Sequence, residues 1–259
     1  MSSESFDQAN KLESNAQPSN LEESLEQMKE GGHMKRDSHS DRTLHEHGHE
    51  HLIHELPQRT YADGSPLALL GFSAGIFLIS SCGLAVRGVA TPNILVGMLV
   101  FFSGIAQFVG GIFCWIAGNT YEGTVFPAYG AFNLAYGIIY VPGSGIMDAY
   151  TDSKTGELND QFAPAVALFL WAWFIVTFIF VVGAIKTNWV LFIDLVVLDL
   201  VFMLLAIGNM NDNTACSKAG SALGYVCAFL TFILGAHNLW AFNTPIRVPV
   251  FPMPGTKRD

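Results

Sequence analysis

The chain has 259 residues, of which 51% are hydrophobic and only 14% are charged. A soluble domain usually carries about 25% charged residues, so this composition argues against a soluble globular protein. The formal net charge of -9 comes largely from the N-terminal tail and one loop, and it points to no nucleic-acid partner.

The first 60 residues are predicted to form a disordered tail. They are rich in Ser, Glu, Gln, Asn and His and poor in branched and aromatic residues, so they cannot bury enough surface to offset the entropy of ordering. Histidines alternate with other residues in one tract of this tail, at His45, His47, His49 and His51. Such a tract can bind transition metals weakly, but it lacks a fixed geometry and is interpreted as a solvated linker. No metal site and no cofactor are expected.

Six apolar stretches follow, each about the 17–25 residues that a helix needs to cross a bilayer. Lipid offers no hydrogen-bond partners to a backbone, so spanning segments form helices or closed barrels. The predicted spans cover residues 66–86, 93–116, 124–147, 163–185, 189–208 and 219–241. The sequence therefore predicts an all-α polytopic membrane protein with a six-helix domain at 61–241 and a C-terminal tail at 242–259.

The even number of spans places both termini on one side of the membrane. Lys and Arg near the span ends are more frequent on that side, so the positive-inside rule predicts cytoplasmic termini. The predicted inner set is Arg42, Arg59, Lys186, Arg247, Lys257 and Arg258, against Arg87, Lys154 and Lys218 outside. The acidic loop at 148–161 is then expected to face outward.

Glycines recur inside the spans at helical spacing. Small residues let helix backbones approach closely in lipid, so close packing is the favoured interpretation. The alternative is that some of them line a pore. They are Gly71, Gly75, Gly104, Gly110, Gly111, Gly130 and Gly137.

Polar groups inside spans are costly and are therefore candidate functional residues. Asp199 lies near the middle of the fifth span, where ionisation is unfavourable, so its carboxyl could bind and release a proton. Asp194 lies about 140° around the helix from it and is expected to reach water. His237 is a second proton-linked candidate. A structural hydrogen bond between helices is the alternative for each.

Three further polar side chains lie in the spans, namely Gln107, Asn133 and Asn238. Their amides can pair with a passing solute or can hold helices together. Cys216 is expected in a loop, and the cysteine spacing predicts neither a metal site nor a disulfide framework. The chain lacks Walker, HExxH and GxSxG motifs, and no nucleophile–base set can be named, so no enzyme is predicted.

Four segments carry a further pattern: residues 65–72 (SPLALLGF), 118–124 (GNTYEGT), 129–132 (YGAF) and 142–150 (PGSGIMDAY). In this order they resemble the NPAPLGLxGF, GNTFGAT, YGxFW and PxxGIxxAY signatures of the acetate uptake transporter family. This family is also called the GPR1/FUN34/YaaH family, and the likeness is to its fungal members in particular. The resemblance runs from about residue 60 to residue 240.

The resemblance implies a channel-like subunit that assembles in the lipid bilayer as a homo-hexameric ring, by family default in the plasma membrane. Each subunit would hold its own pathway for acetate or another short monocarboxylate, often linked to protons. Phe72 and Tyr129 would form a narrow apolar constriction, while Gln107 and Asn238 match polar positions of the family.

Departures from the family pattern concern the entrance of the pathway. Asp63-Gly64 stands where the signature opens with Asn-Pro, and Asn133 replaces a Trp. At the end of the second span, residues 113–116 (FCWI) replace Trp-Glu-Phe-Arg, so Cys114 stands where the family has a carboxylate. The identity of the solute is the part of the inference that these changes affect most.

The sequence favours a passive or proton-linked carrier for short monocarboxylates. Backbone N–H groups after Ser65-Pro66, in the motif that contains Gly71, could capture a carboxylate at the helix start. Protonation of the solute or of Asp199 would reduce the cost of crossing. The alternatives are a transporter-like membrane sensor of acetate and an exporter of ammonium, since Phe72, Tyr129 and the neutral Gln107 also suit NH₃.

Overall fold

The computed structural model describes residues 61–241 and 244–253, and the regular elements within these ranges are helices. The predicted N-terminal tail with its His tract lies outside the described residues, as do 242–243 and 254–259. The longer helices are α4 (Ser65–Gly83), α6 (Gln107–Ile116), α7 (Thr120–Ile139), α9 (Phe162–Gly183), α10 (Trp189–Met210) and α11 (Thr214–Trp240). The shorter elements are η1 (Val86–Gly88), η2 (Pro92–Ile94), α5 (Leu95–Gly97), η3 (Met98–Ala106), α8 (Ile146–Ala149) and η4 (Ala184–Lys186).

Among the described residues, five helical stretches are long and apolar enough to cross a membrane. They are Ser65–Gly83, Pro92–Ile116, Phe162–Lys186, Trp189–Met210 and Thr214–Trp240. The prediction of an all-α polytopic membrane protein is therefore confirmed. The second stretch changes its winding along its length, because η3 is a π-helix between the α-helical turns of α5 and α6.

The third predicted span corresponds to α7, which starts and ends earlier than predicted. Asn119 Oδ1 accepts the Glu122 N–H at 3.0 Å and so caps the start of the helix. The prediction that this span reaches residue 147 is wrong, because α7 ends at Ile139. Pro142 lacks a backbone N–H and Gly143 has a φ of +81°, so the chain turns there instead of continuing as a helix.

The start of α11 also differs from the prediction. The helix begins at Thr214, five residues before the predicted 219, because Asn213 Oδ1 accepts the N–H groups of Ala215 and Cys216 at 3.1 and 3.2 Å. Cys216 therefore lies in the first turn of α11, and its predicted loop position is wrong.

Glycines bring α7 and the second span into direct contact. A Cβ on Gly130 would meet Gly104 O and Phe108 N at 2.9 Å, and one on Gly137 would meet Leu99 Cβ at 3.0 Å. The ring of Trp115 leaves no room for a Cβ on Gly123. The contacts move toward the C-terminus of α7 as they move toward the N-terminus of the second span. The two helices therefore run antiparallel. The interpretation of the glycines as packing residues holds here.

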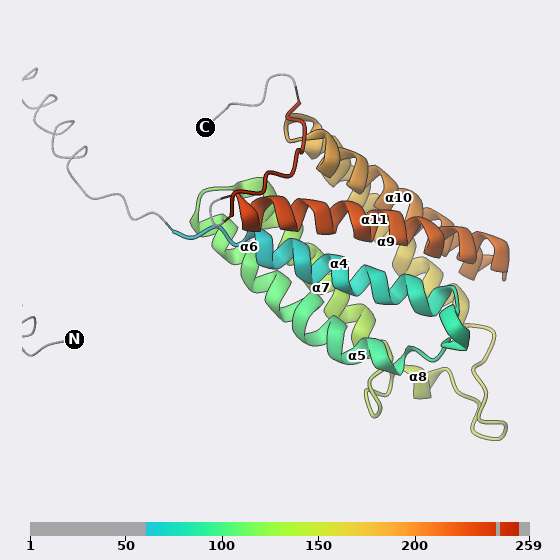
Figure 1. Cartoon of the computed structure of the whole chain (residues 1–259). Coiled ribbons are helices and arrows are strands. Elements are labelled where there is room, and N and C mark those ends of the chain that lie inside the picture. The colour runs from blue at the N-terminus through green and yellow to red at the C-terminus, as the bar shows by residue number, and fades with distance from the viewer. Residues whose placement is uncertain (1–60, 242–243, 254–259) are drawn as a thin grey trace, which may run out of the picture. The chain divides into compact units, whose positions relative to one another are not determined.

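The helices form a bundle around a central axis (Figure 1). α4 packs between α11 and the second span, α10 packs between α9 and α11, and α7 packs on the second span. Aromatic side chains join α7 to α9. The Phe132 ring stacks on Phe169 with centroids 5.7 Å apart, and its centroid lies 5.1 Å from that of Trp173. Side chains of several helices therefore face one another along the axis.

A C-terminal strap, residues 248–253, ties together one end of the bundle. His237 Nδ1 donates to the Val248 carbonyl at 2.5 Å. Trp189 N–H donates to the Phe251 carbonyl at 3.0 Å, and Met253 N–H donates to the Thr187 carbonyl at 3.2 Å. The strap thus links the end of α11 to the connection between α9 and α10. The start of α4 and the end of α11 lie at this same end (Figure 1).

Candidate functional site

Phe72 of α4 and Tyr129 of α7, the two residues that the resemblance nominates for a constriction, meet on the axis of the bundle. Their ring centroids are 5.3 Å apart, and both side chains are buried. The Tyr129 hydroxyl donates to Thr177 Oγ1 of α9 at 3.1 Å, and the Trp173 ring lies 6.1 Å away. Thr177 and Trp173 of α9 thus hold the Tyr129 ring in place, and this ring packs against Phe72 on the axis of the bundle.

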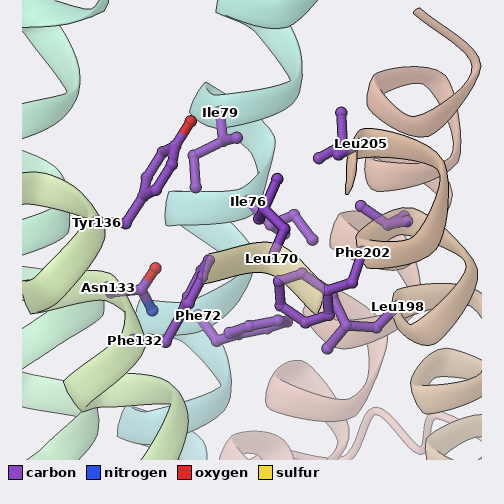
Figure 2. Close-up of a pocket in the computed structure, with 11 residues that line it drawn as sticks. Phe72, Ile76, Ile79, Phe132, Asn133, Tyr136, Leu170, Leu198, Phe202 and Leu205 are labelled. Carbon is purple, nitrogen blue, oxygen red and sulfur yellow. The ribbon is translucent and has the colours of Figure 1, made fainter. Parts of the chain in front are cut away.

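Three cavities follow the axis on either side of these rings. The Phe132 cavity has a volume of about 30 Å³, and Figure 2 shows the apolar side chains of α4, α7 and α10 around it with the Asn133 amide on the α7 side. The Asp194 cavity has about 20 Å³, and the Tyr140 cavity has about 250 Å³. A water molecule needs at least ~10–15 Å³ on this measure, so the two inner cavities hold only very small groups.

The cavities share lining residues and therefore form a file. The Phe132 and Asp194 cavities share Phe72 and Leu198. The Phe132 and Tyr140 cavities share Ile79, Tyr136, Leu170 and Leu205. The Tyr140 cavity reaches the loop after α4, where Ala90 and Pro92 line it. The file thus runs from that loop through the Phe132 cavity and past the Phe72 ring to the Asp194 cavity.

Gln107 and Asn133, both predicted pathway residues, are hydrogen-bonded to each other. Asn133 Nδ2 donates to the Ser103 carbonyl at 3.1 Å and to Gln107 Oε1 at 3.0 Å. A carbonyl only accepts, so its contact fixes which amide atom of Asn133 is Nδ2, and Gln107 must then present Oε1 to it. Gln107 Nε2 is therefore left buried without a partner among the described residues. The Gln107 side chain lines the Asp194 cavity.

Asp194 lies inside the bundle rather than in water. Its side chain is only 3% exposed, so the expectation that it reaches water is wrong. The Thr231 hydroxyl of α11 is hydrogen-bonded to Asp194 Oδ2 at 2.8 Å. Asp194 Oδ1 is buried without a partner among the described residues. Asp194 faces inward because α10 turns it toward α7 and α11, which a single-helix pattern does not reveal.

Asp199 and His237, the predicted proton-linked residues, lie away from these cavities. Asp199 is half-buried, its Oδ1 has no partner among the described residues, and it lines none of the three cavities. His237 holds the C-terminal strap through Val248. The structure therefore does not bring these two residues together with Phe72 and Tyr129.

Ser65 and Asn238 meet at the start of α4, joined by Asp63. Asn238 Nδ2 donates to Ser65 Oγ at 2.7 Å, and Ser65 Oγ donates to Asp63 Oδ2 at 2.6 Å. Asp63 Oδ1 accepts the Ser65 N–H at 2.9 Å. The Ser65 N–H and hydroxyl at the start of α4 are thus both paired with a carboxylate of the chain. Pro66 follows in the first turn of α4, and Gly71 packs against the Phe102 carbonyl of η3.

Two more groups join Asp63 at this end of the bundle. One ligand atom each of Asp63, Cys114 and Glu122 lie within 4.8 Å of one another. The Cys114 thiol is buried and contacts Asp63 Oδ1 at 3.9 Å. We call these three residues the acidic mouth. Its two carboxyl groups favour cations over anions at this end of the bundle.

These contacts show which functional candidates the sequence reasoning missed. Thr231 is absent from the predicted residues, although a Thr in a span is a common hydrogen-bond partner for a buried carboxyl. The sequence prediction includes Asp63 only as a departure from a motif, although an Asp two residues before a helix-starting Ser is a recognisable turn signal.

A file of small cavities along the axis of an apolar helical bundle defines a polytopic membrane protein of channel-like architecture. The chain belongs to the GPR1/FUN34/yaaH family, whose model matches residues 47–255. The membership predicted from the motifs is thereby confirmed.

Individual relatives agree with this assignment. Accumulation of dyads protein 2 of Saccharomyces cerevisiae is 32% identical over 207 residues, which cover 78% of this chain and 70% of the relative. Ammonia transport outward protein 2 of the same yeast is 31% identical with the same coverage. The structure of the bacterial acetate channel SatP superposes with a TM-score of 0.62 at 27% identity, over 73% of this chain and 98% of that one.

Proposed function

We propose that this protein carries a short monocarboxylate, acetate first of all, across a membrane through a pathway inside each subunit. The file of three cavities interrupted at Phe72 and Tyr129 is the observation that carries the proposal. Apolar walls accept a methyl group, and the polar atoms of Gln107 and Asp194 accept a small head group. The likeness to a bacterial acetate channel supports this choice of solute.

We further propose six membrane crossings, with α7 as the third. α7 was not among the five most apolar stretches, but it runs antiparallel along the second span through Gly123, Gly130 and Gly137. Large apolar side chains exposed on α6 and α9, such as Phe113 and Ile179, support contacts with lipid and with other copies in a homo-hexamer. Cytoplasmic termini and a plasma-membrane location complete the proposal. Cross-linking in the native membrane tests the oligomer.

Uptake of labelled acetate into proteoliposomes at neutral pH tests the function. We expect uptake that saturates, that exceeds uptake into protein-free liposomes, and that unlabelled acetate competes away. The protein-free liposomes correct for acetic acid that crosses the lipid by itself. Equal uptake with and without the protein would contradict the proposed function.

Ammonium is the second candidate solute, because the acidic mouth favours a cation. Asp63 and Glu122 place two carboxyl groups at the entrance, and a relative is an ammonia transport outward protein. Ammonium carries hydrogen-bond donors that these acceptors can bind.

Asp63→Asn separates the two candidates. If acetate is the solute, loss of the negative charge is expected to raise acetate uptake at neutral pH by about threefold, the size of a single charge interaction near a protein surface. If ammonium is the solute, its flux should fall by a similar factor. Asp160→Asn, which removes an exposed charge from the loop before α9, serves as the control. Unchanged fluxes of both solutes would show that the acidic mouth does not act on the pathway.

A further inference from the structure

The Asp194 cavity contains two buried polar atoms that have no hydrogen-bond partner in the part of the chain that the structure describes. Gln107 Nε2 belongs to a side chain that is 0% exposed, and Asp194 Oδ1 to one that is 3% exposed. Both residues line the same cavity. A buried polar atom without a hydrogen bond is costly, so two in one small cavity indicate a ligand that pairs with both.

The two atoms have opposite hydrogen-bonding roles. Gln107 Nε2 is a donor, since Oε1 is turned to Asn133. Asp194 Oδ1 is an acceptor, because Oδ2 is the oxygen engaged with Thr231. The Thr231 hydroxyl has one hydrogen but lies within reach of two acceptors, Asp194 Oδ2 at 2.8 Å and the Cys227 carbonyl at 3.0 Å. A proton on Asp194 Oδ2 satisfies all of these oxygens at once.

The surroundings of Asp194 also favour its neutral form. The polar and titratable groups that face it are Gln107 of α6, Tyr129 of α7, and Cys227 and Thr231 of α11, while α4 presents apolar side chains. Among the described residues that line the cavity, none is Lys, Arg or His. A charge buried without a counter-charge is strongly disfavoured.

We propose that the Asp194 cavity binds the solute as a neutral carboxylic acid, an assignment that rests on the proposed function. The acid O–H donates to Asp194 Oδ1, and the acid carbonyl accepts from Gln107 Nε2. A carboxylate anion has no hydrogen to offer Asp194 Oδ1 and would be an unpaired charge in the cavity. The solute therefore brings its own proton, and Asp194 serves as a specificity-determining acceptor rather than as a proton carrier.

The size of the cavity agrees with this ligand. Its volume of about 20 Å³ admits the carboxyl head, and the methyl group must lie against the neighbouring apolar side chains, such as Leu69 and Leu195. A longer polar chain has no partner there. The cavity thus selects short monocarboxylic acids.

Binding to the full-length protein in detergent, measured by calorimetry with acetate and acetamide, tests the assignment. Acetamide is a neutral molecule of similar shape with one N–H₂ donor and one carbonyl acceptor. Above about pH 5 the protonated fraction of a carboxylic acid falls about tenfold per pH unit. We expect the apparent affinity for total acetate to fall by the same factor, and that for acetamide to stay constant. An acetate affinity that is flat with pH, or absent at every pH, would overturn the inference. Binding without uptake would instead overturn only the proposed function.

Two variants of Asp194 test the role of its oxygen. Asp194→Asn keeps Oδ1 as an acceptor and lets Nδ2 donate to Thr231, so acetate and acetamide affinities should stay within about twofold of the wild type. Asp194→Leu removes the acceptor and should weaken both by at least tenfold. Asp199→Leu, five residues along the same helix, is the matched control and should bind normally. Thermal melting of each variant identifies loss of fold.

The contrary outcomes are distinct. If Asp194→Asn loses acetate binding as completely as Asp194→Leu while both melt like the wild type, the proton of Asp194 itself is required and the assignment is wrong. If ammonium chloride binds to the wild type and not to Asp194→Asn, the cavity is a cation site, which also overturns it.

Discussion

Gly130→Leu is expected to prevent the transmembrane domain from folding or to lower its melting temperature more than any other single change described. A Cβ at this position already meets Gly104 O and Phe108 N at 2.9 Å, and both are backbone atoms that cannot turn aside. Overpacking of this kind costs about 1–3 kcal/mol in soluble cores, and a whole Leu side chain between two helices should exceed that range. Thermal melting of the purified protein in detergent measures the effect.

Gly97→Leu is the matched control for this prediction. Gly97 lies in α5 on the partner span, and a Cβ there would meet no atom within 4 Å. Because Leu has a higher helix propensity than Gly, the control should melt at an unchanged or slightly higher temperature. Similar melting of both variants would mean that the close approach of α7 does not hold the bundle together.

Phe72→Ala is expected to widen the range of solutes. Phe72 lines both the Phe132 cavity and the Asp194 cavity, so loss of its ring joins the two spaces. Uptake of larger monocarboxylates such as lactate and benzoate should rise by about tenfold relative to acetate, the change that ~1.4 kcal/mol in a barrier produces. Truncation of a buried Phe also costs about 3–5 kcal/mol of stability, less where a cavity already exists.

Uptake of a size series of labelled acids into proteoliposomes measures this selectivity. Phe101→Ala is the control, since the Phe101 ring is 69% exposed on the outside of η3. Should Phe72→Ala keep the wild-type ratio of lactate to acetate while still folding, the rings of Phe72 and Tyr129 would not set the size limit.

The positions of the helices were largely predictable because the length of an apolar stretch is a strong signal. Their ends were less so, since local capping decides them. The early start of α11 depends on Asn213, and the early end of α7 on the turn at Pro142 and Gly143. Both signals are present in the sequence, but hydropathy outweighed them in the prediction.

The inner face of each helix could not be predicted from one sequence. Asp194 and Asp199 lie on the same helix, and only the packing of α10 between α9 and α11 turns the first of them toward the cavity. Phe72 and Tyr129 were nominated by motifs rather than by periodicity, and their rings lie 5.3 Å apart in the bundle. The pairing of Gln107 with Asn133 follows from the contact between η3, α6 and α7, which the sequence does not specify.

The backbone of the C-terminal strap forms hydrogen bonds with some helices of the described part of the bundle and not with others. Its bonds at Val248 and Phe251 join the end of α11 to the start of α10. Asp194 and Thr231 lie on these two joined helices, and their side chains are 2.8 Å apart. Gln107, Phe72 and Tyr129 stand on helices that the strap does not hold. The Asp194 cavity is therefore lined on one side by helices that the strap joins and on the other side by helices that it leaves unjoined.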